Sequence, residues 1–229
     1  MRSLPRFTPV AEHALLIELG AEIGDDTTRA VLSLDRALAG NPPEGLVEVV
    51  PALVNLLVEF DPVETDHEAM QAAITALLDH TTDHAPEVTT HEVAVCYDAD
   101  LGPDLSAVAQ AKGMSEEAVI AAHLAGDYRV GMYGFAPGYA YLTGLDPVIE
   151  VPRKQTAVRD VPAGSVIIAG PQCLVTTLKA PTGWSILGAS PARILTGDPA
   201  RPFLFNVGDH IRFTRVDRTA FEAMGGAPT

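Results

Sequence analysis

Residues 128–147 read YRVGMYGFAPGYAYLTGLDP, and this stretch sets the character of the C-terminal part of the chain. Glycine and proline recur every few residues within it, and short runs of aromatic and apolar residues stand between them. The same texture continues through short β-rich runs at 166–169, 174–178, 193–195 and 210–215. Short strands separated by frequent turn signals are typical of a closed or nearly closed β-barrel. We therefore expect this part of the chain to form a barrel.

The N-terminal part has a different periodicity. Compact apolar runs at 14–19, 47–50 and 53–60 predict strands. Apolar residues at helical spacing between 30 and 38, and again between 69 and 78, predict two helices. The order strand, helix, strand, strand, helix indicates a small ferredoxin-like α/β domain. With the barrel behind it, the expected fold class is α+β.

A polar segment that contains a proline, TTDHAPE, separates the N-terminal sequence pattern from the C-terminal one. We place the domain boundary there, so that residues 1–86 form the small N-terminal domain and residues 87–229 form the barrel domain. Two short helices, at 104–112 and 115–124, are expected early in the barrel domain.

The composition argues against several classes of function. The chain has 229 residues, of which 30 are acidic and 15 basic, and its net charge is −15. A field of that sign repels phosphate backbones and anionic lipid surfaces, so we expect neither a nucleic acid nor a membrane as a partner. The sequence shows no signal peptide and no membrane-spanning run, and two cysteines make no disulfide framework. These features predict a soluble cytoplasmic protein.

Common catalytic signatures are absent from the sequence. It contains no phosphate-binding GxxxxGK[ST] loop and no GxGxxG, HExxH or GxSxG motif. His80 and His84 have the i,i+4 spacing of metal ligands, but they stand where a helix is expected to end, and histidines there usually complement the helix dipole. No metal site is predicted.

The clearest candidate for a binding site is a turn within the opening stretch. Pro137-Gly138 requires a tight turn, and Phe135, Tyr139 and Tyr141 surround it, although aromatic residues make up only 6% of the chain. A turn flanked by aromatic rings forms a rigid apolar wall with hydroxyl tips, which suits a small planar ligand. The alternative, to which we give equal weight, is that these rings fill one end of the barrel.

Polar candidates follow this turn along the sequence. Arg153, Lys154 and Arg159 place three basic residues within seven positions. The planar fork of an arginine suits a carboxylate or a phosphate. Gln172 offers hydrogen bonds to an amide. The alternative for the basic residues is a solvated loop on an acidic protein.

His123 ends the second short helix and is the expected acid/base catalyst, because an unperturbed histidine titrates near neutral pH. The alternative is a histidine whose hydrogen bonds are satisfied at a helix end. Cys173 has no activating base nearby in the sequence and is expected to be structural. The only tryptophan, Trp184, stands on a Pro-Thr-Gly turn, a position typical of an anchor in a core or an interface.

Six stretches, taken together, resemble a known family. They are ALLIE at 14–18, VPALVNLLV at 50–58, GFAPGYAYL at 134–142, Pro152-Arg153, VPAGSV at 161–166 and PTGW at 181–184. In this order they are similar to the family that includes the first subunit of allophanate hydrolase, the B subunit of 5-oxoprolinase and the sporulation kinase inhibitor. The resemblance implies a small N-terminal α/β domain followed by a cyclophilin-like β-barrel.

The resemblance also implies a function. It implies an ATP-dependent amide hydrolase that acts on a small cyclic amide or ureido substrate, with ATP as the cofactor. The chain would work in a hetero-oligomer with a second barrel subunit, similar to the second subunit of allophanate hydrolase or the C subunit of 5-oxoprolinase. Arg153 and Lys154 would then hold a phosphate or carboxylate, His123 would move a proton, and Tyr139 and Tyr141 would wall the ligand. The chain itself has no Met-Lys-Met biotin-attachment motif, so it is not expected to carry biotin.

Two alternatives follow from the same resemblance. One is a regulatory module that inhibits a histidine kinase by gripping a peptide. The other is the carboxyltransferase half of a biotin-dependent system of the urea carboxylase type. The chain departs from the family pattern in the barrel, at Val158, Ile167, Thr176, Thr177 and Thr182. These departures leave the expected fold intact and the substrate open.

Overall fold

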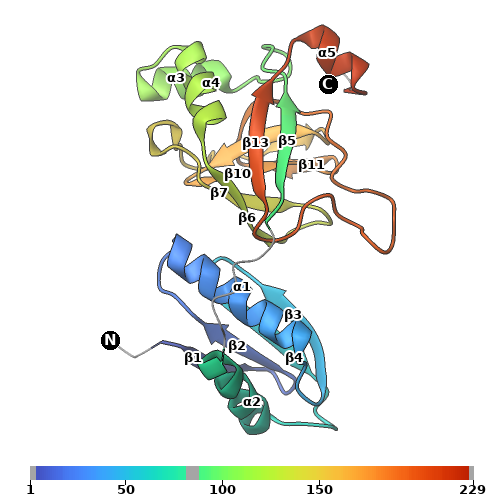
Figure 1. The fold of residues 1–229 in the computed structure, drawn as a ribbon. Coiled ribbons are helices and arrows are strands. Elements are labelled where there is room, and N and C mark those ends of the chain that lie inside the picture. The colour runs from blue at the N-terminus through green and yellow to red at the C-terminus, as the bar shows by residue number, and fades with distance from the viewer. Residues whose placement is uncertain (1–3, 81–87, 227–229) are drawn as a thin grey trace. The chain divides into compact units, whose positions relative to one another are not determined.

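The computed structural model describes residues 4–80 and 88–226. The chain divides into two compact units, Met1–Glu87 and Val88–Thr229 (Figure 1). Each unit has a hydrophobic core of its own. The boundary expected after Pro86 lies outside the described residues, as does His84.

The N-terminal unit is a four-stranded antiparallel sheet with the strand order β1-β2-β4-β3 and two helices. The elements are β1 (Arg6–Val10), β2 (Ala14–Glu18), α1 (Asp25–Gly40), β3 (Leu46–Pro51), β4 (Asn55–Phe60) and α2 (His67–His80). The part from β2 to α2 has the order expected for a ferredoxin-like unit. Strand β1 was not predicted, because it is an edge strand that contains Pro9 and exposes most of its side chains.

One face of this sheet is apolar and meets both helices. Leu15 and Ile17 on β2 and Leu56 and Val58 on β4 alternate with more exposed residues, and all four are fully buried. Leu34 of α1 packs into the same cluster. Burial of each such side chain stabilises the unit by about 1.5–3 kcal/mol, so this face fixes the strand register.

The C-terminal unit is a seven-stranded sheet that curls into a nearly closed barrel, with the strand order β12-β9-β10-β7-β6-β13-β5 (Figure 1). Its strands are β5 (Thr90–Val95), β6 (Tyr128–Tyr133), β7 (Ala140–Thr143), β9 (Ser165–Ala169), β10 (Gln172–Val175), β12 (Ser185–Ala189) and β13 (His210–Arg215). The two edges meet where Cys96, just after β5, and Ala189 exchange two backbone hydrogen bonds of 2.8 and 2.9 Å. The α+β class with a C-terminal barrel is therefore as predicted.

Shorter elements surround the barrel. They are α3 (Leu105–Lys112), α4 (Glu116–Ala125), a 3₁₀ turn (Pro147–Ile149), the paired strands β8 (Val158–Val161) and β11 (Ala180–Thr182), and α5 (Arg218–Ala223). The strand predicted at 193–195 is not formed. Leu195 makes only an isolated bridge to Phe203, in a loop that Pro191 and Pro202 interrupt.

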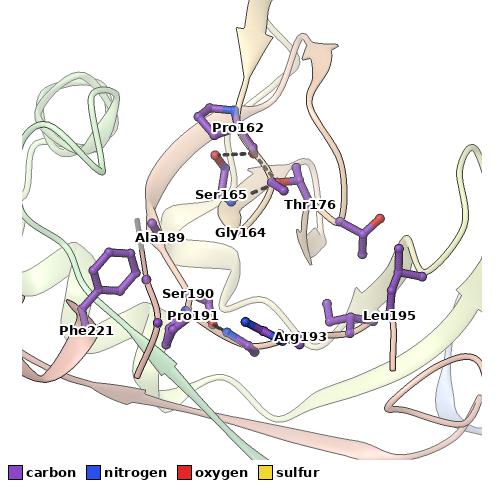
Figure 2. Close-up of a pocket in the computed structure, with 16 residues that line it drawn as sticks. Pro162, Gly164, Ser165, Thr176, Ala189, Ser190, Pro191, Arg193, Leu195 and Phe221 are labelled. Atoms are coloured by element: carbon purple, nitrogen blue, oxygen red, sulfur yellow. Dashed lines mark hydrogen bonds between the residues drawn. The ribbon is translucent and has the colours of Figure 1, made fainter. Parts of the chain in front are cut away.

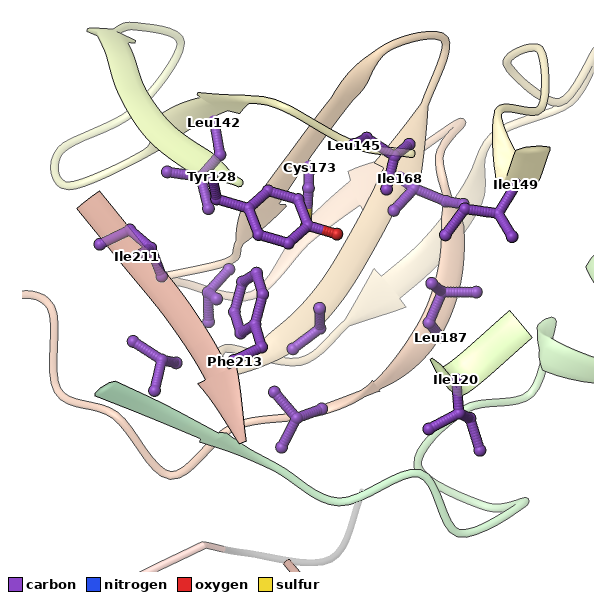
Figure 3. Packing of buried hydrophobic residues seen from close by; sticks show 14 of the residues in the cluster. Ile120, Tyr128, Leu142, Leu145, Ile149, Ile168, Cys173, Leu187, Ile211 and Phe213 are labelled. Carbon is purple, nitrogen blue, oxygen red and sulfur yellow. The ribbon is translucent and has the colours of Figure 1, made fainter. Parts of the chain in front are cut away.

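Apolar side chains fill the interior of the barrel. Tyr128 and Phe213 pack edge to face at a ring-centre distance of 4.9 Å near its middle (Figure 3). Helices α3 and α4 pack onto the same cluster through residues such as Val108 and Ile120. A small barrel filled in this way is a packed core, so a ligand must bind on its outer face or at its ends. Within the described part of the chain, no helix combines the length and apolarity needed to cross a membrane.

Candidate functional site

The predicted aromatic turn, part of the basic segment and the tryptophan turn converge on one cavity of about 130 Å³, here called the aromatic cavity. Ile167 on β9 and Leu174 on β10 form part of its wall, whereas their neighbours Ile168 and Cys173 face the barrel interior. The cavity therefore lies on the outer face of the barrel. The lining residues are Phe135, Tyr139, Tyr141, Arg153, Ile167, Leu174, Pro181, Thr182, Gly183 and Trp184.

The turn between β6 and β7 is held in an unusual backbone conformation. Phe135 has φ of 67° and Gly138 has φ of 75°. Residues other than glycine rarely adopt this backbone conformation. The N–H of Ala136 donates to the carbonyl of Gly134 at 2.8 Å, and Thr177 Oγ1 donates to the carbonyl of Pro137 at 2.6 Å. Phe135 is consequently held 74% exposed at the cavity rim, with its ring 5.3 Å from that of Tyr139.

Arg153 supplies the charge of the aromatic cavity. Its guanidinium carbon lies 5.6 Å from the centre of the Trp184 ring, and Tyr141 packs against the same indole edge-on at 5.8 Å. None of the described lining residues is acidic, and no carboxylate forms an ion pair with Arg153 in the described ranges. A planar cation stacked on an indole beside an aromatic wall suits a planar ligand that carries a carboxylate.

Two hydrogen bonds hold the Pro-Thr-Gly-Trp turn, one to a side chain and one to the backbone. Thr182 Oγ1 accepts a hydrogen bond from the N–H of Trp184 at 3.1 Å, and the carbonyl of Gly183 accepts one from the N–H of Lys154 at 2.7 Å. The indole is almost fully buried as a result, with 5% of its surface exposed. The sequence placed Trp184 on a turn without linking it to a binding site, and its ring proves to be the surface on which Arg153 lies.

Lys154, Arg159 and Gln172 do not line the aromatic cavity. The ammonium of Lys154 is bound to the carboxylate of Asp104, so its role is structural in this arrangement. Arg159 is exposed on β8, and Gln172 pairs with Ala169 in the hairpin of β9 and β10. Pro137 and Gly138 form the back of the turn and contact Thr177 and Leu195 instead.

His123 does not lie at the edge of the cavity, and this corrects the expected role of a catalyst. Its side chain is fully buried in the barrel core, where its ring lies 4.7 Å from that of Phe213. Nδ1 shares a hydrogen bond of 2.7 Å with the Tyr97 hydroxyl, and Nε2 lies 3.5 Å from Sγ of Cys173. Burial lowers the pKa of His123 to about 3, so the imidazole stays neutral near pH 7. Because the side chain is fully buried, it also has no access to a substrate in the aromatic cavity.

Cys173 has the structural role expected from the sequence. It is fully buried beside His123, and burial raises the pKa of its thiol far above the usual range. Cys96 is buried as well, and both cysteines are free. Neither thiol is therefore available as a nucleophile at neutral pH.

A larger cavity of about 310 Å³, here called the second cavity, lies beside the VPAGSV segment (Figure 2). The carbonyl of Pro162 accepts hydrogen bonds from the hydroxyls of Ser165 at 3.0 Å and Thr176 at 2.7 Å, and these bonds hold the segment in place. Arg193 is the only charged residue among the described lining residues. The sequence predicted no site here, although the VPAGSV motif marked the segment.

The positions that depart from the family pattern lie mostly at these two cavities. Ile167 and Thr182 line the aromatic cavity, and Thr176 and Thr177 line the second cavity. Val158 is exposed on β8 and lines neither. Four of the five departures therefore line one of the two cavities.

Comparison with known proteins places the chain in a family. Residues 5–205 match the family described as the carboxyltransferase domain, subdomain C and D, and the chain belongs to it. In particular, the chain is 31% identical to the 5-oxoprolinase B subunit of Bacillus subtilis (strain 168) over 225 residues, which cover 93% of this chain and 94% of that protein.

Solved structures agree with this assignment. TTHA0988 is 32% identical, with a TM-score of 0.79 over 90% of this chain. The match covers 40% of the TTHA0988 chain, so this protein spans about two fifths of it. The urea carboxylase of Kluyveromyces lactis has a TM-score of 0.72 at 16% identity, over 92% of this chain and 22% of that one. At that identity the likeness is one of fold alone.

Proposed function

We propose that this chain is one subunit of an ATP-dependent amide hydrolase of the 5-oxoprolinase type, and that the aromatic cavity holds its small cyclic amide substrate. The observation that carries the proposal is a coincidence of two findings. The chain is similar over nearly its whole length to the B subunit of a 5-oxoprolinase. Its outer barrel face also carries a small aromatic cavity whose only charged lining residue, among those described, is Arg153.

The cavity matches the chemistry of a lactam that bears a carboxylate. The ring plane of such a substrate can lie along Tyr141 and Trp184, and its carboxylate can take the fork of Arg153. A cavity of about 130 Å³ is smaller than a typical drug-sized site, which favours a small compound. In this proposal the chain binds and orients the substrate.

Proton transfer needs groups that the aromatic cavity lacks. Its titratable lining residues are Tyr139, Tyr141 and Arg153, and burial raises the pKa of Tyr139 further from neutrality. ATP would supply activation of the amide carbonyl by phosphoryl transfer. Because the sequence has no phosphate loop, we place ATP and the acid/base groups on a second subunit or at its interface with this chain.

Two observations support a second subunit. The relative from Bacillus subtilis is named as a B subunit, which implies other subunits in that system. The TTHA0988 chain is much longer than its matched part, so a related unit there is joined to further sequence. The cytoplasm, where ATP is abundant, is part of the same proposal, and the two free cysteines fit it.

The proposal is tested by reconstitution. The chain is co-expressed with the related larger subunit from its gene neighbourhood, and release of glutamate from 5-oxoproline is measured with and without ATP. We expect ATP-dependent hydrolysis by the complex and none by either subunit alone. A stable complex that leaves 5-oxoproline and related ureido compounds intact in the presence of ATP would contradict the proposal.

A carboxyltransferase is the second candidate. The family description names a carboxyltransferase domain, and the fold is shared with a urea carboxylase. In that case the aromatic cavity would receive the planar ureido ring of carboxybiotin from another chain. Carboxyl transfer from a carboxybiotin donor to urea, in the absence of 5-oxoproline hydrolysis, would favour this candidate over the first.

A further inference from the structure

We propose that Asp104 sets the charge selectivity of the aromatic cavity by neutralising Lys154, the basic neighbour in sequence of Arg153, which is the one charged residue among the described residues that line the cavity. The cavity then selects planar monocarboxylates over dianions. This inference rests on the proposed role of Arg153 as the carboxylate-binding residue, and it adds the residue that decides which anions that site accepts.

Asp104 lies at a helix N-cap but does not cap the helix with its side chain. It stands at the N-cap of α3, where an aspartate normally accepts hydrogen bonds from the first backbone N–H groups of the helix. Its side chain makes no such bond. Oδ2 instead accepts from the ammonium of Lys154 and, at 2.7 Å, from the N–H of Ile186. The carboxylate therefore binds the residues that follow Arg153 and Trp184 in the chain, and it does not cap its own helix.

The same contacts fasten the basic segment to the strand that follows Trp184. The backbone N–H of Asp104 donates to the carbonyl of Ile186 at 3.1 Å, and the N–H of Lys154 donates to the carbonyl of Gly183 at 2.7 Å. Both partners of the Asp104–Lys154 pair are mostly buried, with 20% and 24% of their side-chain surfaces exposed. Together these bonds hold Arg153 in register with the indole.

Among the described residues that line the cavity, Arg153 carries the one charge. Two cations adjoin in sequence, Arg153 and Lys154, and Asp104 compensates the second of them. The basic side chain just before β11, Lys179, is paired with Asp160 at 3.0 Å. A partly buried charge pair is screened less than a surface pair, so removal of the Asp104 charge changes the potential at Arg153 directly. A site with one net positive charge matches a monoanion.

Trp184 makes the inference measurable in the isolated full-length chain, because it is the only tryptophan and its ring lines the cavity. Its emission is titrated with 5-oxoproline, a monocarboxylate, and with malonate, a dianion at pH 7.5. We expect the wild type to prefer 5-oxoproline. Asp104→Asn keeps an oxygen for the N–H of Ile186 but frees the charge of Lys154. It should shift the ratio of the two dissociation constants about fivefold toward malonate.

Two further variants separate charge from structure. The double variant Asp104→Asn/Lys154→Met removes both charges and should restore the wild-type preference. Asp160→Asn frees the exposed Lys179 and should leave the preference unchanged, because that pair is largely solvated. An unchanged ratio in folded Asp104→Asn overturns the inference. The inference is also overturned if Asp104→Asn weakens the binding of both ligands equally and shifts the Trp184 emission, because that result gives Asp104 a purely structural role.

The failure of the proposed function has a different signature. If the wild type binds 5-oxoproline with the predicted selectivity but the reconstituted complex does not hydrolyse it, the hydrolase proposal fails and the charge inference stands. If the wild type binds neither anion at millimolar concentration, the aromatic cavity is not an anion site and the inference fails with it.

Discussion

Arg153 lies over the face of Trp184, with its guanidinium carbon 5.6 Å from the ring centre, and no described carboxylate competes for its charge. A cation held on an indole in this way keeps its fork free for a ligand while its position is fixed. The pairing joins two segments, the basic run and the Pro-Thr-Gly-Trp turn, that are about 30 residues apart in sequence.

The first prediction concerns this pair. Arg153→Gln removes the charge that we assign to the substrate carboxylate, and it should raise KM for 5-oxoproline about tenfold in the reconstituted complex with little change in kcat. The matched control is Arg159→Gln, which removes an exposed arginine that does not line the cavity. Equal KM values for the two variants would argue against substrate binding by Arg153.

A second prediction concerns the backbone of the aromatic turn. A Cβ atom added at Gly138 would stand 2.8 Å from the side chain of Leu195, and φ there is 75°. Gly138→Ala should therefore cost about 1–3 kcal/mol in the free energy of unfolding. Gly183→Ala is the control, because its Cβ would meet nothing closer than the Lys154 carbonyl at 3.5 Å. Equal melting temperatures for Gly138→Ala and Gly183→Ala would contradict the strain argument.

The sequence predicted the fold well where one periodicity governs a segment. The strands around Leu15 and Leu56 alternate buried and exposed residues, and turn signals punctuate the barrel, so both units could be expected. The edge strand β1 escaped because an exposed strand with a proline has no alternating pattern. The prediction of a strand at 193–195 was wrong because a short run with apolar residues does not show whether a neighbouring strand is available to pair.

The candidate site could be predicted in part, because the residues beside a turn are known from the local sequence. Aromatic residues around a Pro-Gly turn must gather wherever the turn lies, so Phe135, Tyr139 and Tyr141 were found from local sequence. Burial depends on the packing of distant segments, and so His123 was misplaced. The partner of Lys154 was equally hidden, because Asp104 is 50 residues away and resembles an ordinary helix cap.

A third prediction follows from the separate cores. The buried clusters of the two units share no residue, so the unit of residues 88–229 should fold when it is produced alone. Its Trp184 emission and its melting transition should match those of the same unit in the full chain. An unfolded fragment would show that the barrel depends on the N-terminal unit for its stability.

The last prediction concerns pH and tests the corrected role of His123. Burial lowers its folded-state pKa to about 3, while an unfolded histidine titrates near about 6.5. Between these values the unfolded chain binds a proton that the folded chain does not. The free energy of unfolding should therefore fall as the pH drops from about 6.5 toward 3, by up to about 1.4 kcal/mol per pH unit from this residue.

His123→Gln removes that proton linkage, because the glutamine amide stays neutral while it can still hydrogen-bond to the Tyr97 hydroxyl. Urea unfolding followed by Trp184 emission reports on the barrel unit, and the difference in slope against pH between wild type and variant isolates His123 from the carboxylates that titrate in the same range. Parallel slopes would contradict a buried neutral imidazole. The pH profile of turnover in the complex should be unchanged in a folded His123→Gln, whereas loss of its acidic or basic limb would return His123 to acid/base catalysis.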